Sequence, residues 1–292
     1  MTSHTQPLPA NTTSAGPTAW REVGTLRLLT WPALDASGVD AAVTARPGGV
    51  SSGVYASLNL SLSVGDDPAS VLENRRRLAA GFGARPADFV FAGQVHGAGV
   101  QVVGEADRGS GTFSLDNVIP ATDALVTRSR AVVLAILTAD CVPIVLYDPV
   151  AGVLACVHAG WRGTVARVSA AAVAAMQTLG SRPADVIAGI GPAIPVARYQ
   201  VGPDVYQAVT QAFGPAPFIR PDAVPDRWRL DLWSANRFVL TEAGVPAPHI
   251  HITDIPTGPT DPTSPGYFFS DRSARPCGRL ALIARLRTGG DR

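Results

Sequence analysis

The sequence predicts an α/β fold in which helices pack on a mixed, largely antiparallel sheet. Short apolar runs typical of strands are interspersed with amphipathic segments of helical period, without the regular alternation of Rossmann or TIM folds. A chain of 292 residues with 46% hydrophobic content is ample for one packed core. We therefore expect a single domain over residues 19–292. Residues 1–18, rich in Thr, Ser, Pro and Ala, are expected to be a disordered leader.

Local signals place the elements along the chain. Asp67 and Pro68 are a candidate N-cap and first turn of a helix that ends near Gly81 or Gly83. An apolar stripe over residues 165–179 predicts a second helix, and residues 203–213 and 231–243 predict two more. Strands are expected at residues 27–30, 40–46, 89–92, 100–103, 186–190, 249–255, 267–270 and 280–286, with a short alternating segment at 57–60.

The most informative segment is a predicted hairpin within residues 137–163. Two apolar strands flank a turn at 148–151, so that Tyr147 is expected to face Gly152 and Cys141 to face His158. Side chains directly opposite on antiparallel strands project to the same face with Cβ atoms roughly 4.5 to 5.5 Å apart, which suits a thiolate and an imidazole that share one metal ion. A bulge near Pro143 would change this register.

The third ligand is expected to be His96, which lies in a glycine-flanked break between two extended segments. Zinc held by two imidazoles and one thiolate keeps a fourth position for water or substrate, so the site would be catalytic. Cys156 is assigned to the core and Cys277 to an incidental thiol. His249 and His251 share a strand face, and a second metal site there is an alternative that lacks a third ligand.

Polar groups near these ligands are candidates for substrate binding. Arg162 precedes a predicted helix start, where free amide groups and a guanidinium can hold an anion such as phosphate. Arg46 and Asn59 lie on loops near strand ends, and turn stabilisation is the alternative reading of both. Asp140 adjoins Cys141 and is a candidate proton shuttle, although in a regular strand it would point to the opposite face.

The composition excludes several classes of function. All 24 basic residues are arginine, so a Schiff-base lysine and an ordinary P-loop are excluded. The net charge of +1 predicts no broad basic face for nucleic acid or membranes and favours small, roughly neutral partners. No apolar stretch or signal peptide stands out, and three cysteines form no disulfide framework. We expect a cytoplasmic protein with reduced thiols.

A set of ordered motifs resembles the laccase-domain family, the multicopper polyphenol oxidase type that is associated with purine nucleoside phosphorylase activity. The resemblance covers about residues 40–285, and its pieces lie at residues 44–53, 57–60, 64–68, 73–75, 94–96, 138–141, 158–163, 190–192 and 268–270. It implies that His96, Cys141 and His158 bind one zinc ion. It also implies a layered α-β-β-α domain similar to the catalytic domain of cytotoxic necrotizing factor toxins. Cysteines that are usual in the family are replaced here by Ala193 and Ile252.

The resemblance implies phosphorolysis of adenosine, inosine, guanosine and methylthioadenosine, with Arg46, Asn59 and Arg162 as members of the substrate site. Deamination of adenosine by activated water at C6 could share the same centre. Copper-dependent oxidation of polyphenols is the alternative, although five histidines are too few for a four-copper laccase. A cell-wall-related accessory protein with a structural metal site is a third reading. The oligomeric state is left open.

Overall fold

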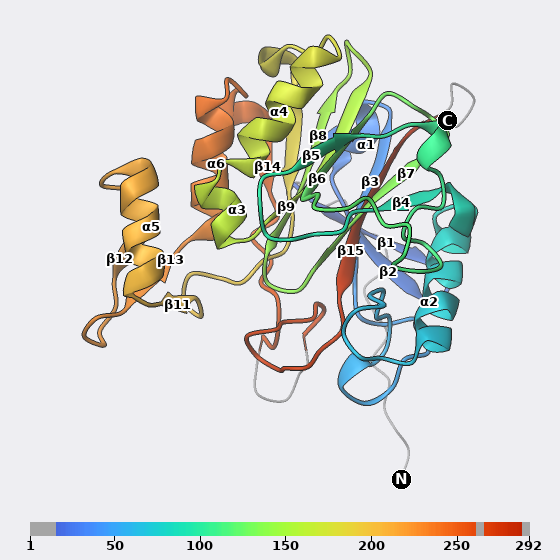
Figure 1. The fold of residues 1–292 in the computed structure, drawn as a ribbon, viewed down its shortest axis with the longest axis horizontal. Helices are drawn as coiled ribbons and strands as arrows, with labels where there is room; N and C mark the ends of the chain where they lie inside the picture. The colour runs from blue at the N-terminus through green and yellow to red at the C-terminus, as the bar shows by residue number, and fades with distance from the viewer. Residues whose placement is uncertain (1–15, 261–265, 288–292) are drawn as a thin grey trace.

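The computed structural model describes residues 16–260 and 266–287. The predicted leader at residues 1–18 therefore lies almost entirely outside the described residues. Two six-stranded sheets form the centre of the molecule, and the helices lie on their outer sides (Figure 1). None of the helices in the described ranges is long and apolar enough to cross a membrane.

Both sheets are mixed and largely antiparallel, as predicted. In each, parallel pairing is confined to the edges, where β4 pairs with β7 in the first sheet, and β5 with β6 and β10 with β14 in the second. The first sheet has the order β1 (Ala19–Val23), β2 (Leu26–Thr30), β3 (Val39–Thr44), β15 (Leu280–Leu286), β7 (Val133–Thr138) and β4 (Phe89–Phe91). The second has the order β14 (Ile250–Ile252), β10 (Ile187–Ile190), β8 (Val142–Asp148), β9 (Val153–Ala159), β6 (Ala124–Thr127) and β5 (Val100–Val102).

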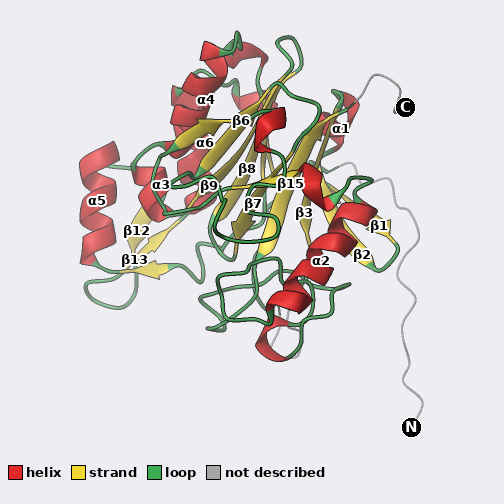
Figure 2. Ribbon diagram, turned by 45° about the vertical axis from the view of Figure 1, so that its right-hand side comes forward, coloured by secondary structure: helices red, strands yellow, loops and turns green. Residues whose placement is uncertain are grey.

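Three hydrophobic cores define four layers. One lies between the two sheets, a second lies between the first sheet and α2 (Pro68–Gly81), and the third lies between the second sheet and the helices that cover it. Those covering helices are α3 (Trp161–Val165), α4 (Val168–Thr178) and α6 (Leu232–Glu242), whereas α5 (Pro203–Phe213) packs against α3 farther from the sheet, as Figure 2 shows. The layering is α-β-β-α. The specific likeness to the toxin catalytic domain stays a prediction.

Smaller elements complete the chain. Helix α1 (Pro32–Ala36) leads into β3. A three-stranded sheet that the sequence did not indicate joins β11 (Gln200–Val201), β13 (Trp228–Leu230) and β12 (Ile219–Pro221). Short 3₁₀ turns lie at Gly53–Tyr55, Pro86–Asp88, Glu105–Asp107, Pro183–Asp185 and Ala247–His249.

The central hairpin of β8 and β9 is buried on both faces, which explains its continuous apolar sequence. Along β8, Ile144 and Leu146 face the helices, whereas Val145 and Tyr147 face the other sheet. A strand that packs against a layer on each side has no solvated face and therefore needs no polar alternation. Cys156 is fully buried between the sheets, in agreement with its assignment to the core.

The predicted register of this hairpin is wrong by two residues. Asp148 pairs with Val153, so His158 lies opposite Pro143 and not opposite Cys141. The turn moved because the Asp148 carboxylate accepts hydrogen bonds from the amides of Val150 and Ala151 at 2.8 and 2.9 Å, and this closes the loop one residue later. A shift of two residues conserves the face on which each side chain lies. His158 therefore still points where the prediction placed it.

Three further expectations differ from the structure. Residues 267–270 form no strand. The side chains of the consecutive residues Phe268 and Phe269 both pack into the core between the sheets, whereas consecutive side chains of a strand point to opposite faces. Residues 57–60 likewise form no strand. The stripe over 165–179 is divided into α3 and α4 by Arg167, whose φ of 59° is left-handed and breaks the helical hydrogen-bond ladder.

Candidate functional site

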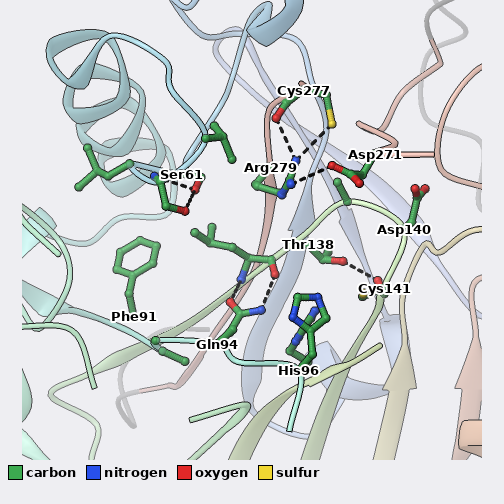
Figure 3. Close-up of a pocket in the computed structure, with 18 of the residues that line it drawn as sticks. Ser61, Phe91, Gln94, His96, Thr138, Asp140, Cys141, Asp271, Cys277 and Arg279 are labelled. Carbon is green, nitrogen blue, oxygen red and sulfur yellow. Dashed lines mark hydrogen bonds and ion pairs between the residues drawn. The ribbon is translucent and has the colours of Figure 1, made fainter. Parts of the chain in front are cut away.

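A cavity of about 840 Å³ opens where the strands of both sheets end (Figure 3). Thr138 closes β7, Cys141 immediately precedes β8, and His158 lies one residue before the end of β9. All three line the cavity, together with residues from the loop that precedes β15. The site is therefore built at one end of the two-sheet stack, where loops from several elements meet.

Gln94 redirects the chain so that His96 can reach this end of the sheets. Its side-chain amide donates to the Leu137 carbonyl at 2.7 Å and accepts from the Leu137 amide at 2.8 Å, as the paired dashed lines in Figure 3 show. The side chain thus satisfies the peptide groups of β7 that a continuing β4 would have paired. The backbone is free to leave the sheet, and His96 adopts a left-handed φ of 60°.

The three predicted ligands converge. One nitrogen of His96, the Cys141 sulfur and one nitrogen of His158 all lie within 4.8 Å of one another. The two imidazole rings meet edge to face with centroids 4.9 Å apart. His158 is buried and His96 is exposed, so the cluster has a closed side in the protein and an open side toward the cavity. Among the described residues this is the one group of three or more such side chains.

Asp123, which the sequence analysis missed, holds two of the ligands in place. Its carboxylate is fully buried and lies 2.9 Å from His158 Nδ1, and it accepts backbone hydrogen bonds from Val95, His96 and Gly97. With Nδ1 engaged, His158 presents Nε2 to the cluster. The only sequence signal was an acidic residue directly before a buried strand.

We expect Asp123→Asn to weaken zinc binding by roughly 10- to 100-fold, because a carboxylate behind a ligating histidine fixes the ring and its tautomer. Competition with a chromophoric zinc chelator measures this change. Asp204→Asn, at an exposed position in the first turn of α5, is the matched control. Equal zinc affinity in the two variants would show that Asp123 does not support the ligands.

The charges of the cluster couple the protonation states of its side chains. Burial acts to raise the pKa of the Cys141 thiol, but His158 and His96 beside it lower that pKa to about 6. Burial acts to lower the pKa of His158, but the Cys141 thiolate and Asp123 raise it to about 9. Burial acts to raise the pKa of Asp123, but the hydrogen bonds that it accepts from His158 and Gly97 outweigh this effect and lower that pKa. Between these pH values Cys141 and His158 form a thiolate–imidazolium pair.

The thiolate–imidazolium pair determines how many protons are released when a metal ion binds. A metal ion requires a thiolate and a neutral imidazole, so at pH 7.5 Cys141 is already ionised whereas His158 must lose its proton. We expect the release of about one proton per zinc ion at pH 7.5, and more below pH 6, where the thiol is also protonated. Calorimetry in buffers of different ionisation enthalpy measures the release. No proton release at pH 7.5 would contradict the pairing.

Gly160 provides the space in which the ligands meet. A Cβ at this position would lie 2.9 Å from the Cys141 sulfur, closer than real Cβ contacts come, and 3.1 Å from Cδ2 of His96, tighter than most of them. One thiolate and two imidazoles are ligands that zinc prefers, and a buried carboxylate supports one of them. The residues present therefore fit a single zinc ion.

Asp140 does not follow the strand geometry assumed for it. Its φ of 90° places it in a bend before β8, so strand parity does not apply, and its side chain lines the cavity while pointing away from His96 (Figure 3). Its two carboxylate oxygens accept from the Thr257 hydroxyl at 2.6 Å and the Arg272 amide at 2.7 Å. These contacts tie the loop around residue 272 to the cluster.

The three predicted substrate residues are not brought together. Arg162 lines the cavity and is exposed, with its guanidinium 4.4 Å from the Trp161 ring centroid. Arg46 is not among the lining residues; it donates to the Ala56 carbonyl and stacks on Phe269.

Asn59 is fully buried and also lies outside the lining residues. It donates to Asp66 at 2.9 Å and accepts from the Arg279 amide at 2.9 Å. The cavity contains four arginines that the sequence analysis did not select as site residues, and these come from α2 and the 271–279 loop: Arg75, Arg272, Arg275 and Arg279.

The remaining thiol and histidine candidates have simpler positions. Cys277 is 3% exposed, lines the cavity and accepts a hydrogen bond from Arg279 at 3.2 Å. Burial raises the pKa of its thiol, although Arg279 opposes this. His249 and His251 belong to no group of three candidate ligands in the part of the chain that the structure describes.

The α-β-β-α fold with a His–Cys–His cluster at one end of its sheets defines a class of protein, and the comparisons with known proteins agree with that class. Residues 40–287 match the family described as multi-copper polyphenol oxidoreductase laccase, and the chain belongs to that family. It is 39% identical over 253 residues to the purine nucleoside phosphorylase YlmD of Geobacillus stearothermophilus, covering 85% of this chain and 91% of the relative.

A solved structure of the same relative and one further relative extend the comparison. The crystal structure of YlmD from Geobacillus stearothermophilus superposes with a TM-score of 0.85 at 36% identity, covering 92% of this chain and 98% of that one. An adenosine deaminase, RL5, from an unidentified prokaryote is 38% identical over 214 residues, covering 73% of this chain and 82% of the relative. The homologues thus indicate an enzyme that processes purine nucleosides.

Proposed function

We propose that this protein is a zinc-dependent purine nucleoside phosphorylase in which His96, Cys141 and His158 hold one zinc ion. The observation that carries the proposal is the convergence of these three ligand atoms within 4.8 Å on the wall of an arginine-lined cavity. When bound, zinc would supply Lewis-acid chemistry with a fourth position open to the cavity. A cytoplasmic location stays a prediction.

The charges of the cavity suit phosphate as a co-substrate. Arg162, Arg272 and Arg279 line it, and planar guanidinium groups bind phosphate oxygens in pairs. In phosphorolysis a phosphate oxygen forms a bond to C1′ of the ribose while the bond from C1′ to the purine breaks, and the departing base takes a proton. We assign to these arginines the placement of phosphate against C1′, which converts an encounter into an oriented reaction.

The aromatic side chains of the cavity suit the purine. Phe91, Trp161 and Tyr199 all line it. Burial, reinforced by the negative charges of Cys141 and Asp140, raises the pKa of Tyr199, so its phenol stays neutral. Aromatic faces bind flat heterocycles by stacking. A volume of about 840 Å³ is in the range of pockets that enclose molecules of nucleoside size.

Arg46 and Asn59 are proposed to act on the site by positioning. Arg46 fixes the loop through Ala56, and Asn59 fixes the Arg279 backbone at the cavity wall. In this proposal neither touches the nucleoside.

Adenosine deamination is a second candidate, supported by the similarity to the deaminase relative. Here water replaces the amino group at C6 of adenosine, and inosine and ammonia leave. The same metal centre and the same purine-binding walls would serve both reactions, whereas phosphate is required for only one of them.

Product analysis separates the candidates. With inosine, the zinc-loaded protein is expected to release hypoxanthine and ribose 1-phosphate only when phosphate is present. With adenosine and no phosphate, formation of inosine and ammonia reports deamination. Oxygen-dependent phenol turnover in proportion to copper, without base release from any nucleoside, would replace this proposal with the oxidase.

A further inference from the structure

A second cavity, of about 340 Å³, lies at the opposite end of the two-sheet stack. Strand β15 connects the two regions, because Arg279 just before it lines the first cavity, whereas Leu286 and Arg287 at its far end line the second. Seven residues of strand span roughly 23 Å. The β6–β7 loop and the turn of the central hairpin supply the other walls. This cavity is therefore separate from the zinc cluster.

Arginines dominate the second cavity. Arg128, Arg130 and Arg287 line it, and none of its lining residues is acidic. Arg287 is neutralised by ion pairs with Asp40 at 2.9 Å and Asp35 at 3.4 Å. Arg128 and Arg130 are exposed and have no ion pair or side-chain hydrogen bond within the described ranges. Guanidinium groups that share a cavity repel one another unless an anion lies between them.

The neighbouring groups reinforce this asymmetry. Asp148 is fully buried, and its oxygens are occupied by the amides of Val150, Ala151 and Arg182, so it is not free to pair with an arginine. Tyr147 lines the same cavity. Burial raises the pKa of its phenol although Arg130 opposes this, so the hydroxyl remains protonated and able to donate a hydrogen bond.

We propose that this cavity is a binding site for an oligophosphate, with inorganic pyrophosphate as the simplest ligand. Arg128 and Arg130 bind its oxygens, the Tyr147 hydroxyl donates to it, and the paired Arg287 forms the third wall. The volume lies near the lower limit of pockets that bind small molecules, and it suits a compact anion better than a large apolar ligand. The site does not depend on the proposed reaction at the zinc cluster.

Isothermal titration of the full-length protein with sodium pyrophosphate tests the proposal. The double variant Arg128→Gln/Arg130→Gln removes both unpaired guanidinium groups. The matched control is Arg220→Gln/Arg237→Gln, which loses the same charge from two exposed arginines elsewhere on the surface. Arg162→Gln separately removes a guanidinium group from the first cavity, so that pyrophosphate binding there is distinguished from binding at the second.

The wild-type protein is expected to show a binding event that survives in Arg162→Gln and in the control. In Arg128→Gln/Arg130→Gln its dissociation constant should rise at least tenfold, while inosine phosphorolysis and the unfolding temperature stay unchanged. Equal affinity in the double variant and the control would overturn the proposal. An equal loss of affinity in both variants would show that pyrophosphate responds only to net charge, and this too would overturn the proposal. A wild-type protein whose binding is lost in Arg162→Gln would overturn it as well, because the binding would then belong to the first cavity.

Discussion

Cys141→Ala is expected to lose nearly all phosphorolysis of inosine and most of its bound zinc. The thiolate is the one anionic ligand of the cluster, and removing it leaves two neutral imidazoles to hold a divalent cation. Changes in the outer shell of metal sites already cost roughly 10- to 100-fold, so we expect a loss of turnover above about 100-fold. Zinc content by mass spectrometry and hypoxanthine release measure the two effects on the same samples.

Cys156→Ala is the matched control for this variant. Its thiol is fully buried between the sheets, and burial raises its pKa, so it is neither ionised nor near the cluster's open side. The control should retain zinc and turnover. If Cys141→Ala keeps both as well, the assignment of the metal site is wrong. If it keeps zinc and loses turnover, Cys141 acts on the substrate and not on the metal.

Arg75→Ala is expected to give the largest loss of stability. Arg75 is 4% exposed, and its guanidinium donates to the carbonyls of Leu60, Gly111 and Thr112 at 2.6 to 2.9 Å, while it stacks on Phe91 at 4.0 Å. Burial lowers its pKa only to about 10, so it remains charged at neutral pH. Truncation would leave several buried carbonyls without a donor, at a cost of about 3 kcal/mol or more.

Urea unfolding followed by fluorescence measures this cost. Arg76→Ala is the control on the neighbouring residue of α2, because Arg76 is exposed and its side chain pairs with Glu73 on the helix surface. We expect the urea midpoint of Arg76→Ala to stay close to that of the wild-type protein. Equal midpoints for the two variants would contradict the structural role of Arg75. Arg75→Lys should also be destabilised, since a single ammonium lacks the fork of N–H groups with which the guanidinium reaches three carbonyls.

The sequence predicted the fold class because its signals are local. The apolar runs of β8 and β9 and the capping residue Asp67 depend on residues close to them in the sequence. The Asp67 carboxylate does cap α2 by accepting from the Ser70 amide. The small sheet of β11, β12 and β13 was missed because its strands are two or three residues long and bury few side chains. Strands this short carry no measurable period.

The candidate site was predicted as a set of ligands but not as a pocket. Face parity placed Cys141 and His158 together even though the register was off by two residues, because such a shift leaves the faces unchanged. Asp123 and Gln94 act through partners that are 27 and 43 residues away in the chain, and no local pattern marks such contacts. The arginines of the 271–279 loop likewise reach the cavity only through the tertiary fold.

X-ray absorption at the zinc K-edge of the zinc-loaded protein tests the central claim most directly. Three side chains that converge within 4.8 Å are expected to bind one zinc ion per chain through one sulfur at about 2.3 Å and nitrogen or oxygen neighbours at about 2.0 to 2.1 Å. The sulfur contribution should vanish in Cys141→Ala and persist in Cys156→Ala. A spectrum of the wild-type protein without sulfur, or with more than one sulfur per zinc, would contradict the account.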